Sequence, residues 1–316
     1  MLKFALKWFK NLFPPLLGIF LIYYSYINTS IEDRNTIYFT IINVSYPYVI
    51  LSVFFGMLSH ISRSMRWQQM LSPLGYKVRI TNSIMFVLIA FLSNLGIPRS
   101  GEILRASSAT FYNNIPFEKG FGTIIAERII DVLILGTIIF SGILISSKIS
   151  LPENSETISQ SFILISLFVL FFTTLYIYKK KELKLKILSI LDGLIKGVLS
   201  INNVKNKPLF IFHTFFIWLC YFLMFYVVKF SIPETANLNF EPILLAFIAG
   251  AITMAITNGG IGAYPLAIAA VVTQYNVPYE SALALGWVVW SSQTIMIIIF
   301  GSLSFIFLPI LTNKFF

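Results

Sequence analysis

Apolar stretches long enough to cross a lipid bilayer recur along the whole of this chain. A membrane-spanning helix takes about 20 predominantly apolar residues, and such stretches fill the 316 residues so fully that no separate water-soluble domain fits between them. Hydrophobic residues make up 57% of the sequence and charged residues 11%, whereas charged residues are about 25% of an ordinary soluble domain. The sequence therefore predicts an all-α polytopic membrane protein.

Six segments have the length and composition of spanning helices. They lie at about residues 12–27, 40–61, 120–147, 158–178, 209–228 and 282–310. The first follows MLKFALKWFK and resembles a secretory signal peptide, but the next segment, SYINTSIEDR, has no small-residue cleavage site. We therefore expect an uncleaved first helix and about six spans in all.

Two further apolar regions are each interrupted in the middle. Residues 83–96 are followed by the break IPRSG, and residues 242–260 by the break IGAYP. Each arm has about 15 residues, or about 22 Å of helix, against a hydrocarbon core of about 30 Å. Glycine and proline interrupt the helix and leave backbone N–H and C=O groups without hydrogen bonds, which lipid cannot supply. We therefore predict two re-entrant helical hairpins with buried tips, and a ten-span arrangement with tilted arms is the alternative. The residues on which these breaks depend are Pro98, Gly101, Gly259, Gly260, Gly262 and Tyr264.

The distribution of basic residues predicts an orientation, because Lys and Arg concentrate on the cytoplasmic side. With the N-terminus inside, three basic residues fall in external segments: Arg34, Lys148 and Lys229. Seventeen fall in cytoplasmic segments: Lys3, Lys7, Lys10, Arg63, Arg66, Lys77, Arg79, Lys119, the eight lysines from Lys179 to Lys207, and Lys314. Both termini are therefore expected in the cytoplasm, with the chain in a bacterial inner membrane. The net charge of +10 would suggest nucleic acid in a soluble protein, but its distribution indicates membrane topology instead, so we expect no nucleic-acid partner.

An internal repeat is indicated by a short motif. Asn114-Ile-Pro-Phe-Glu118 recurs as Asn276-Val-Pro-Tyr-Glu280, 162 positions later, and the glycine-rich breaks align at nearly the same offset. Each half then reads helix, helix, hairpin, helix, and the two halves have opposite orientations. This plan is common among secondary transporters. We expect one repeat in residues 1–150 and the second in residues 151–316.

A basic segment at about residues 179–207 connects the two halves. Its apolar residues share one helical face, and its charged residues fall largely on the other. The pattern favours an amphipathic helix on the anionic inner leaflet, with a solvated linker as the alternative.

Six charged residues lie between Gly96 and Asp131, where the sequence otherwise predicts membrane-embedded helices. They are Arg99, Glu102, Arg105, Glu127, Arg128 and Asp131. An ionisable side chain at bilayer depth costs about 3 kcal/mol on insertion scales and so marks a functional site. Helical spacing allows Glu102 to approach Arg105, and Glu127, Arg128 and Asp131 to share one flank.

Two interpretations of these charges remain open. Arginine forks suit phosphate and carboxylate, and Arg99 lies at a break where a helix N-terminus favours an anion. The six residues are then a substrate or coupling-ion site, in which Glu102, Glu127 and Asp131 orient the arginines. Alternatively, three positive and three negative charges form an ion-pair network that only holds the hairpin to the next helix, although buried pairs rarely offset their desolvation cost.

Signatures of soluble enzyme classes are missing from the sequence. There is no phosphate-binding loop or nucleotide-binding fingerprint, so we expect no cofactor. One cysteine, Cys220, excludes an internal disulfide and a multi-cysteine metal site. The two histidines, His60 and His213, are expected as polar residues near helix ends, and no metal site is predicted. A carboxylate that acts as a general base remains the one catalytic alternative.

At these residues the chain resembles the flippase-like transmembrane domain that forms the membrane half of bacterial lysylphosphatidylglycerol synthases and also exists as free-standing proteins. The resemblance rests on Pro98, Gly101, Glu102 and Arg105, on Glu127-Arg128 with Asp131, and on Gly259-Gly260-Ile-Gly262. Many relatives carry an acidic residue just after the second glycine turn, where this chain has Tyr264 and Pro265. The resemblance also implies that a chain without the soluble aminoacyl-transferase half does not itself make lysyl-lipid.

The resemblance implies movement of an anionic or aminoacylated phospholipid, or of another lipid-linked substrate, between leaflets. Membrane lipids are then the partners, and a homo-oligomer is compatible with the sequence. The main alternative is an integral-membrane transferase, or the partner of one, that handles a polyprenyl-phosphate lipid. A third reading is an assembly subunit that transports nothing.

Overall fold

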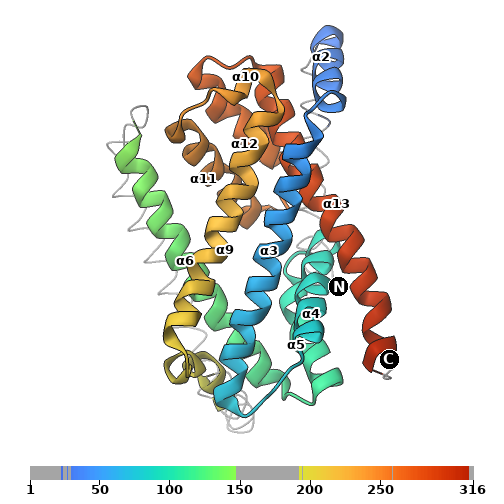
Figure 1. Ribbon diagram of the computed structural model, residues 1–316, viewed down its shortest axis with the longest axis vertical. Coiled ribbons are helices and arrows are strands. Elements are labelled where there is room, and N and C mark those ends of the chain that lie inside the picture. The colour runs from blue at the N-terminus through green and yellow to red at the C-terminus, as the bar shows by residue number, and fades with distance from the viewer. Residues whose placement is uncertain are drawn as a thin grey trace, which may run out of the picture.

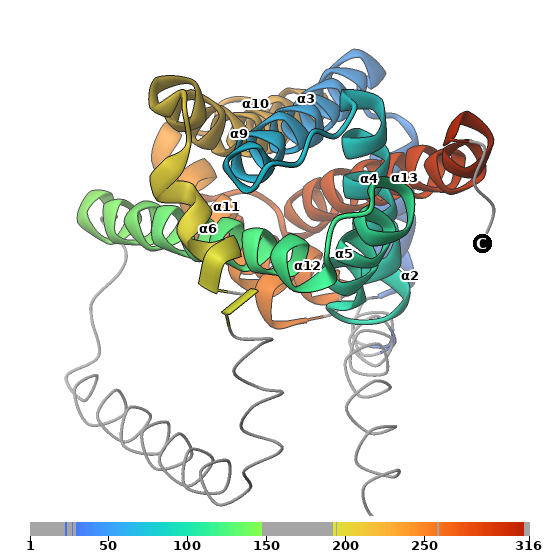
Figure 2. The same cartoon turned by 90° about the horizontal axis from the view of Figure 1, so that it is seen from below.

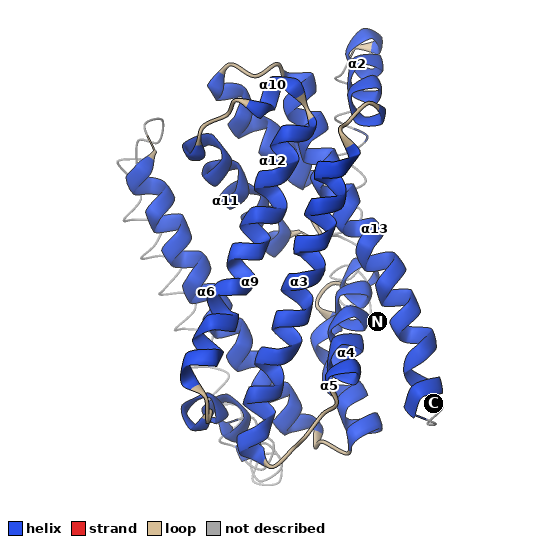
Figure 3. Ribbon diagram, viewed as in Figure 1, coloured by secondary structure: helices blue, strands red, loops and turns tan. Residues whose placement is uncertain are grey.

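The computed structural model describes residues 30–146 and 192–312, apart from 194 and 258, together with Tyr23 and Ile27. All regular structure in these residues is helical (Figure 1, Figure 3). Besides the long helices, they form α2 (Ile31–Ile42), α10 (Pro233–Ala236) and four short 3-10 turns: η1 (Ser72–Leu74), η2 (Ser200–Asn203), η3 (Lys229–Ser231) and η4 (Thr273–Tyr275).

Within the described residues, four helices are long and apolar enough to cross a membrane. They are α3 (Tyr46–Leu71), α6 (Phe117–Ile145), α9 (Lys207–Val228) and α13 (Tyr279–Thr312). Four of the six predicted spans correspond to these helices. The predicted spans at 12–27 and 158–178 lie outside the described residues, apart from Tyr23 and Ile27, which are helical.

The predicted bounds of the second span, 40–61, are wrong at both ends. Pro47 lies at the start of α3, where its fixed φ and missing N–H favour a new helix, and the preceding residues 31–42 form α2 instead. The helix then continues ten residues past 61 and ends just before Pro73. Arg63 and Arg66, which we assigned to a cytoplasmic loop, are therefore inside a spanning helix.

The first hairpin consists of α4 (Ile80–Gly96) and α5 (Ser100–Asn113). The break falls between them, as predicted, and Arg99 adopts a left-handed backbone conformation with φ 57°. Gly101 lies so close to α4 that a Cβ atom there would be 2.1 Å from the carbonyl oxygen of Ala90. The Gly101 N–H donates to Asn94 Oδ1 at 2.7 Å, which ties the two arms together.

The second hairpin consists of α11 (Phe240–Ile256) and α12 (Ala263–Val272). Gly259, Gly260 and Gly262 have φ of 64°, 73° and 69° in the turn between the arms, a region that residues with a Cβ adopt at a cost. A Cβ on Gly259 would be 3.3 Å from the Leu95 side chain at the end of α4. The two hairpin tips therefore meet, and glycine at the second tip permits the approach.

Hydrogen bonds show that α3 and α9 run antiparallel. Ser52 Oγ, near the start of α3, donates to the Met224 carbonyl near the end of α9 at 2.7 Å, and Ser62 Oγ lies 2.8 Å from His213 Nδ1. The first hairpin thus extends from the end of the molecule where α9 begins, and the second from the end where α9 stops (Figure 1).

The helix that follows each hairpin crosses to the other hairpin. In α6, Gly142 lies against the Ile248 side chain of α11, and in α13, Gly301 lies against Leu88 and Leu92 of α4. Figure 2 shows α13 beside α4 when the molecule is seen from below. Each hairpin therefore packs against the long helix that follows the other hairpin.

The repeated motif has the same conformation at both sites. Asn114 and Asn276 are both left-handed, with φ of 54° and 63°, and long helices begin three residues later, at Phe117 and Tyr279. The division into repeats at residue 150 stays a prediction, because residues 147–191 are not described.

Each hairpin packs into its own apolar core. The core of the first is built around Trp67, Phe86 and Ile124, and that of the second around Phe225, Ile243 and Ile268. Of the predicted amphipathic segment, residues 195–199 are helical, and Asp192 and Lys196 form an exposed ion pair at 2.6 Å. The rest of that segment up to residue 191 lies outside the described residues.

Candidate functional site

Five charged side chains from three helices form one buried group, which we call the arginine cluster. Its members are Arg63 and Arg66 of α3, Arg105 of α5, and Glu127 and Asp131 of α6. Each is at most 8% exposed. Helical spacing explains the arrangement, because Arg63 and Arg66 are three apart and Glu127 and Asp131 four apart, so each pair projects from one face of its helix.

Glu127 lies at the centre of the cluster. Its Oε1 accepts from Arg63 and lies 3.5 Å from Arg66 Nη2, and its Oε2 accepts from Arg105 Nη2 at 3.2 Å. One carboxylate thus faces three guanidinium groups and joins the first hairpin to both long helices.

Asp131, one turn further along α6, completes the cluster. Its Oδ2 accepts from Arg63 at 2.7 Å and its Oδ1 from Arg66 at 2.9 Å. Both carboxylates are occupied by guanidinium groups, so neither has an open face that would suit a metal cation.

Aromatic and hydroxyl groups surround the arginines. The Arg105 guanidinium carbon is 4.2 Å from the centre of the Trp67 ring, whose Nε1 donates to Thr123. Arg63 donates to the Tyr221 hydroxyl at 3.1 Å. A guanidinium over an aromatic face gains a further attraction where water is excluded, so these rings fix the arginine planes.

The charges of the cluster do not cancel. Three arginines face two carboxylates, which leaves one formal positive charge. The Nε atoms of Arg63, Arg66 and Arg105 are buried without a hydrogen-bond partner among the described residues. A buried cation that lacks full pairing is costly. An anion in contact with these groups would supply both the missing charge and acceptors.

A second, more exposed ion pair lies beside the cluster. Arg128 of α6 forms an ion pair with Glu102 of α5, with 2.8 Å between Nη2 and Oε1, and Arg128 Nη1 lies 3.8 Å from Asp131 Oδ2. The Arg128 side chain is 41% exposed. The pair lines a cavity of about 330 Å³ between α5 and α6, and the other lining residues are Phe121, Ile124, Ile125, Ile129, Val132 and Leu133. Arg128 therefore connects an apolar cavity on the surface with the buried charges.

Of the six predicted site residues, five lie in the cluster or in this adjacent pair. Arg99 does not, because it is exposed at the hairpin tip and has no ion pair or hydrogen bond with other described residues. Helical spacing allows Glu102 to approach Arg105, but the two side chains have different partners. Arg105 faces inward and pairs with Glu127, whereas Glu102 pairs with Arg128, because α5 packs with Arg105 and Glu102 on different flanks of α6.

Sequence reasoning missed Arg63 and Arg66. Hydropathy falls after residue 61, which suggested a loop, yet no glycine or proline interrupts the chain between Gly56 and Pro73. That uninterrupted run, with Arg63, Arg66 and Trp67 at helical spacing, was the available signal. The expectation for His60 is also wrong, because it is buried within α3 rather than near its end.

The predicted backbone residues have structural roles around the site. Pro98 lies in the turn between α4 and α5. Tyr264 is buried in α12, and its ring lies against Gly250 of α11 and its Cβ near Gly260. A tyrosine at this position thus packs the second hairpin together, and the hairpin contributes no acidic side chain there.

Comparison with known proteins gives two archaeal relatives. The chain is 26% identical over 222 residues to the UPF0104 membrane protein MJ1078 of Methanocaldococcus jannaschii, which covers 68% of this chain and 93% of that protein. It is 31% identical over 97 residues to the UPF0104 membrane protein MJ1595 of the same organism, which covers 30% of this chain and 29% of that protein. No solved structure matches the chain.

A family model covers nearly the whole sequence. The model of the lysylphosphatidylglycerol synthase TM region matches residues 12–301, a range that includes both hairpins and all members of the arginine cluster. The four long apolar helices and the paired hairpins agree with a multi-pass membrane protein. The chain therefore belongs to the lysylphosphatidylglycerol synthase TM region family.

Proposed function

We propose that this protein binds the anionic headgroup of a membrane lipid at the arginine cluster and moves the lipid between leaflets. The observation that supports this most directly is the unmatched positive charge of three buried arginines against two carboxylates. Phosphate and carboxylate match the guanidinium fork in charge and geometry. The lipid is an anionic or aminoacylated phospholipid or another lipid-linked substrate.

The cavity between α5 and α6 offers the headgroup a route to the cluster. Arg128 lies at this cavity with 41% of its side chain exposed, among Ile125, Ile129 and Val132. A charged group at bilayer depth needs a partner that lipid chains cannot provide. If a lipid headgroup replaced Glu102 as the partner of Arg128, Arg128 would stay paired. The acyl chains of that lipid would lie along the apolar residues of α6.

The hairpins support transport rather than simple binding. Their tips meet at Leu95 and Gly259, and each is held by the long helix of the other half. Short broken helices that meet inside a membrane protein are where many transporters bind their substrates. Small shifts of one hairpin against the other would open the site to alternate sides.

We place the protein in the cytoplasmic membrane with both termini inside. Without the buried Arg63 and Arg66, the basic residues still number fifteen in cytoplasmic segments against three in external ones. The excess of lysine and arginine favours this orientation.

The experiment is leaflet exchange of labelled lipids in liposomes that contain the purified protein. Lipids with phosphatidylglycerol, lysyl-phosphatidylglycerol and phosphatidylcholine headgroups are compared. Arg105→Lys keeps the charge but loses the fork that holds Glu127 and the plane that lies on Trp67. We expect the variant to exchange anionic lipid about tenfold more slowly, which corresponds to about 1.4 kcal/mol.

The matched control is Lys229→Arg in the other half of the molecule. Lys229 is also buried, and its Nζ donates to the Leu238 carbonyl at 2.6 Å outside the arginine cluster. This variant should change stability without slowing exchange. Wild-type exchange by Arg105→Lys, or equal losses in both variants, would contradict a headgroup site at the cluster.

One observation keeps a transferase as the second candidate. Glu102 Oε2 is buried and has no hydrogen-bond partner among the described residues, so this oxygen could accept a proton from a lipid substrate beside Arg128. Incubation with a polyprenyl phosphate that carries a transferable group, together with a phospholipid acceptor, and separation of the products tests this role. A new product that disappears in Glu102→Gln would favour the transferase over the transporter.

A further inference from the structure

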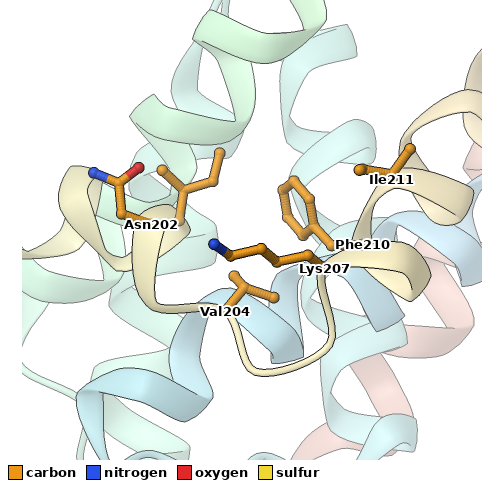
Figure 4. Close-up of a pocket in the computed structure, with 6 residues that line it drawn as sticks. Asn202, Val204, Lys207, Phe210 and Ile211 are labelled. Atoms are coloured by element: carbon orange, nitrogen blue, oxygen red, sulfur yellow. The ribbon is translucent and has the colours of Figure 1, made fainter.

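A second cavity, of about 500 Å³, lies at the end of the molecule where α9 begins. It shares no lining residue with the cavity at Arg128. Figure 4 shows its lining, which comes from η2, from the turn after it and from the first turns of α9: Ile201, Asn202, Val204, Lys207, Phe210 and Ile211.

One lysine gives this cavity its charge, and Asn202 adds a polar side chain to an otherwise apolar lining. The Lys207 side chain lies between Phe210 and Val204, with its amino group directed toward the segment that carries Asn202 (Figure 4). Its ammonium group has no hydrogen bond or ion pair with any described residue. A positive charge beside apolar side chains matches a ligand with a negatively charged headgroup and a hydrocarbon tail.

The position of the cavity along α9 agrees with a bilayer boundary. Asn206 caps the helix by accepting from the Leu209 N–H at 3.1 Å, so Lys207 is in its first turn. Exposed apolar side chains begin within that turn, with Leu209 42%, Ile211 52% and Phe212 54% exposed. A lysine in the first turn of such a helix is where an interfacial basic residue is expected.

The back wall of this cavity is close to the arginine cluster but separate from it. Val204 and Phe210 pack with Met70 of α3 and Ala126 of α6 in one small apolar core. Ala126 precedes Glu127, so one layer of apolar side chains separates the two sites. A ligand in this cavity cannot touch the cluster arginines without displacing that layer.

We propose that this cavity is a separate binding site for an anionic phospholipid, which stays bound at the membrane surface rather than being transported. The Lys207 ammonium holds the phosphate, and an acyl chain lies against Phe210 and Ile211. Charge complementarity selects this ligand, because Lys207 and its exposed neighbour Lys205 make this end of α9 basic and attract anionic lipid. The bound lipid links η2 to α9 beside the cluster.

The test is photo-crosslinking in nanodiscs with phosphatidylglycerol that carries a diazirine in its acyl chain, followed by mass spectrometry of the labelled peptides. We expect labels within residues 201–211, reduced at least fivefold in Lys207→Gln and retained in Lys207→Arg. Lys205→Gln is the matched control, because Lys205 is an exposed neighbour that does not line the cavity. Thermal unfolding in detergent checks that every variant is folded.

Three results would overturn the site. The first is equal labelling by phosphatidylcholine with the same acyl chains, and the second is an equal loss of labelling in Lys205→Gln and Lys207→Gln. The third is a protein–protein crosslink from a diazirine amino acid at Ile211 to residues 151–191, which would mean that the chain's own segment fills the cavity. Failure of the transport proposal gives a different pattern. In that case Arg105→Lys leaves lipid exchange unchanged, while labelling at 201–211 still depends on Lys207.

Discussion

The two hairpin units use the same positions for opposite chemistry. The offset of 162 that relates Asn114 to Asn276 also relates Arg128 to Trp290 and Asp131 to Gln293. In the first unit Arg128 forms an ion pair with Glu102 of its hairpin, and in the second Trp290 Nε1 donates to the carbonyl of Gly259 in its hairpin at 2.7 Å. Both contacts join a long helix to the hairpin that precedes it.

The next turn repeats the contrast against α3. Asp131 accepts from Arg63 at 2.7 Å, whereas Gln293 donates to Ser52 Oγ at 3.1 Å. Tyr264, which corresponds to Glu102 at the same offset, packs on Gly250 without a charge. At these three positions the second unit thus has neutral hydrogen bonds and aromatic packing in place of charges.

This difference bears on why the first unit is charged. The second unit indicates that the scaffold can be joined at these positions without ionic groups, and buried ion pairs are a poor source of stability compared with apolar packing. The charges of the first unit therefore need another reason, and the anionic substrate that we propose would be one. The predictions below test this separation of a charged, substrate-binding half from a neutral, structural half.

Opposite orientation of the two units gives the largest expected contrast, an all-or-none difference in labelling. In a Cys220→Ala background, a single cysteine at Asn237 should react with an impermeant thiol reagent from outside intact cells. A cysteine at Ser72 or Asn203 should react only after the membrane is opened, because these residues lie at the other end of the bundle. All three positions are exposed. External labelling at Asn203 would contradict both the orientation and the inverted arrangement.

Neutralising the central carboxylate should give the largest loss of stability. Glu127→Gln leaves Arg63 and Arg66 with Asp131 and leaves Arg105 without a carboxylate partner among the described residues. Removal of one partner from a buried ionic network costs about 3–5 kcal/mol. The free energy of unfolding, followed in mixed micelles, should fall by that amount and lipid exchange should stop. Glu280→Gln in the other half is the control, because Glu280 forms no ion pair among the described residues. If Glu127→Gln lost no more stability than this control, the cluster would not be tightly coupled.

The two hairpins should differ in their tolerance of a methyl group. Gly101→Ala places a Cβ 2.1 Å from the Ala90 carbonyl oxygen, so α5 must move away from α4, at a cost of about 1–3 kcal/mol. Gly259→Ala meets only the flexible Leu95 side chain at 3.3 Å and bears mainly the cost of its φ of 64°, about 1–2 kcal/mol. Thermal unfolding compares the two variants. A larger loss for Gly259→Ala would mean that strain at the second tip matters more than packing in the first.

Much of this fold was predictable because it follows from local rules. Glycine and proline fix the breaks at 97–99 and 257–262, and apolar length fixes the four described long helices. The composition of the cluster was harder to predict, because it depends on which helix faces are apposed. Glu102 and Arg105 have good spacing for a pair, yet tertiary packing gives them different partners. Arg63 and Arg66 belong to α3, and hydropathy alone predicts that this helix ends before them.

The smallest effect on stability, but the sharpest comparison of the two units, comes from the equivalent residues Arg128 and Trp290. Arg128→Gln removes one side of a partly exposed pair, so the free energy of unfolding should change by about 1 kcal/mol or less, while exchange of anionic lipid should slow about tenfold. Trp290→Phe keeps an aromatic side chain but replaces the indole with a smaller ring that cannot donate to Gly259, which should cost about 1–2 kcal/mol without slowing exchange. Unfolding in detergent and leaflet exchange in liposomes are measured on the same preparations. If instead Arg128→Gln is the less stable variant and Trp290→Phe the less active one, the charged unit is the structural half, and the substrate path has to be sought along α13.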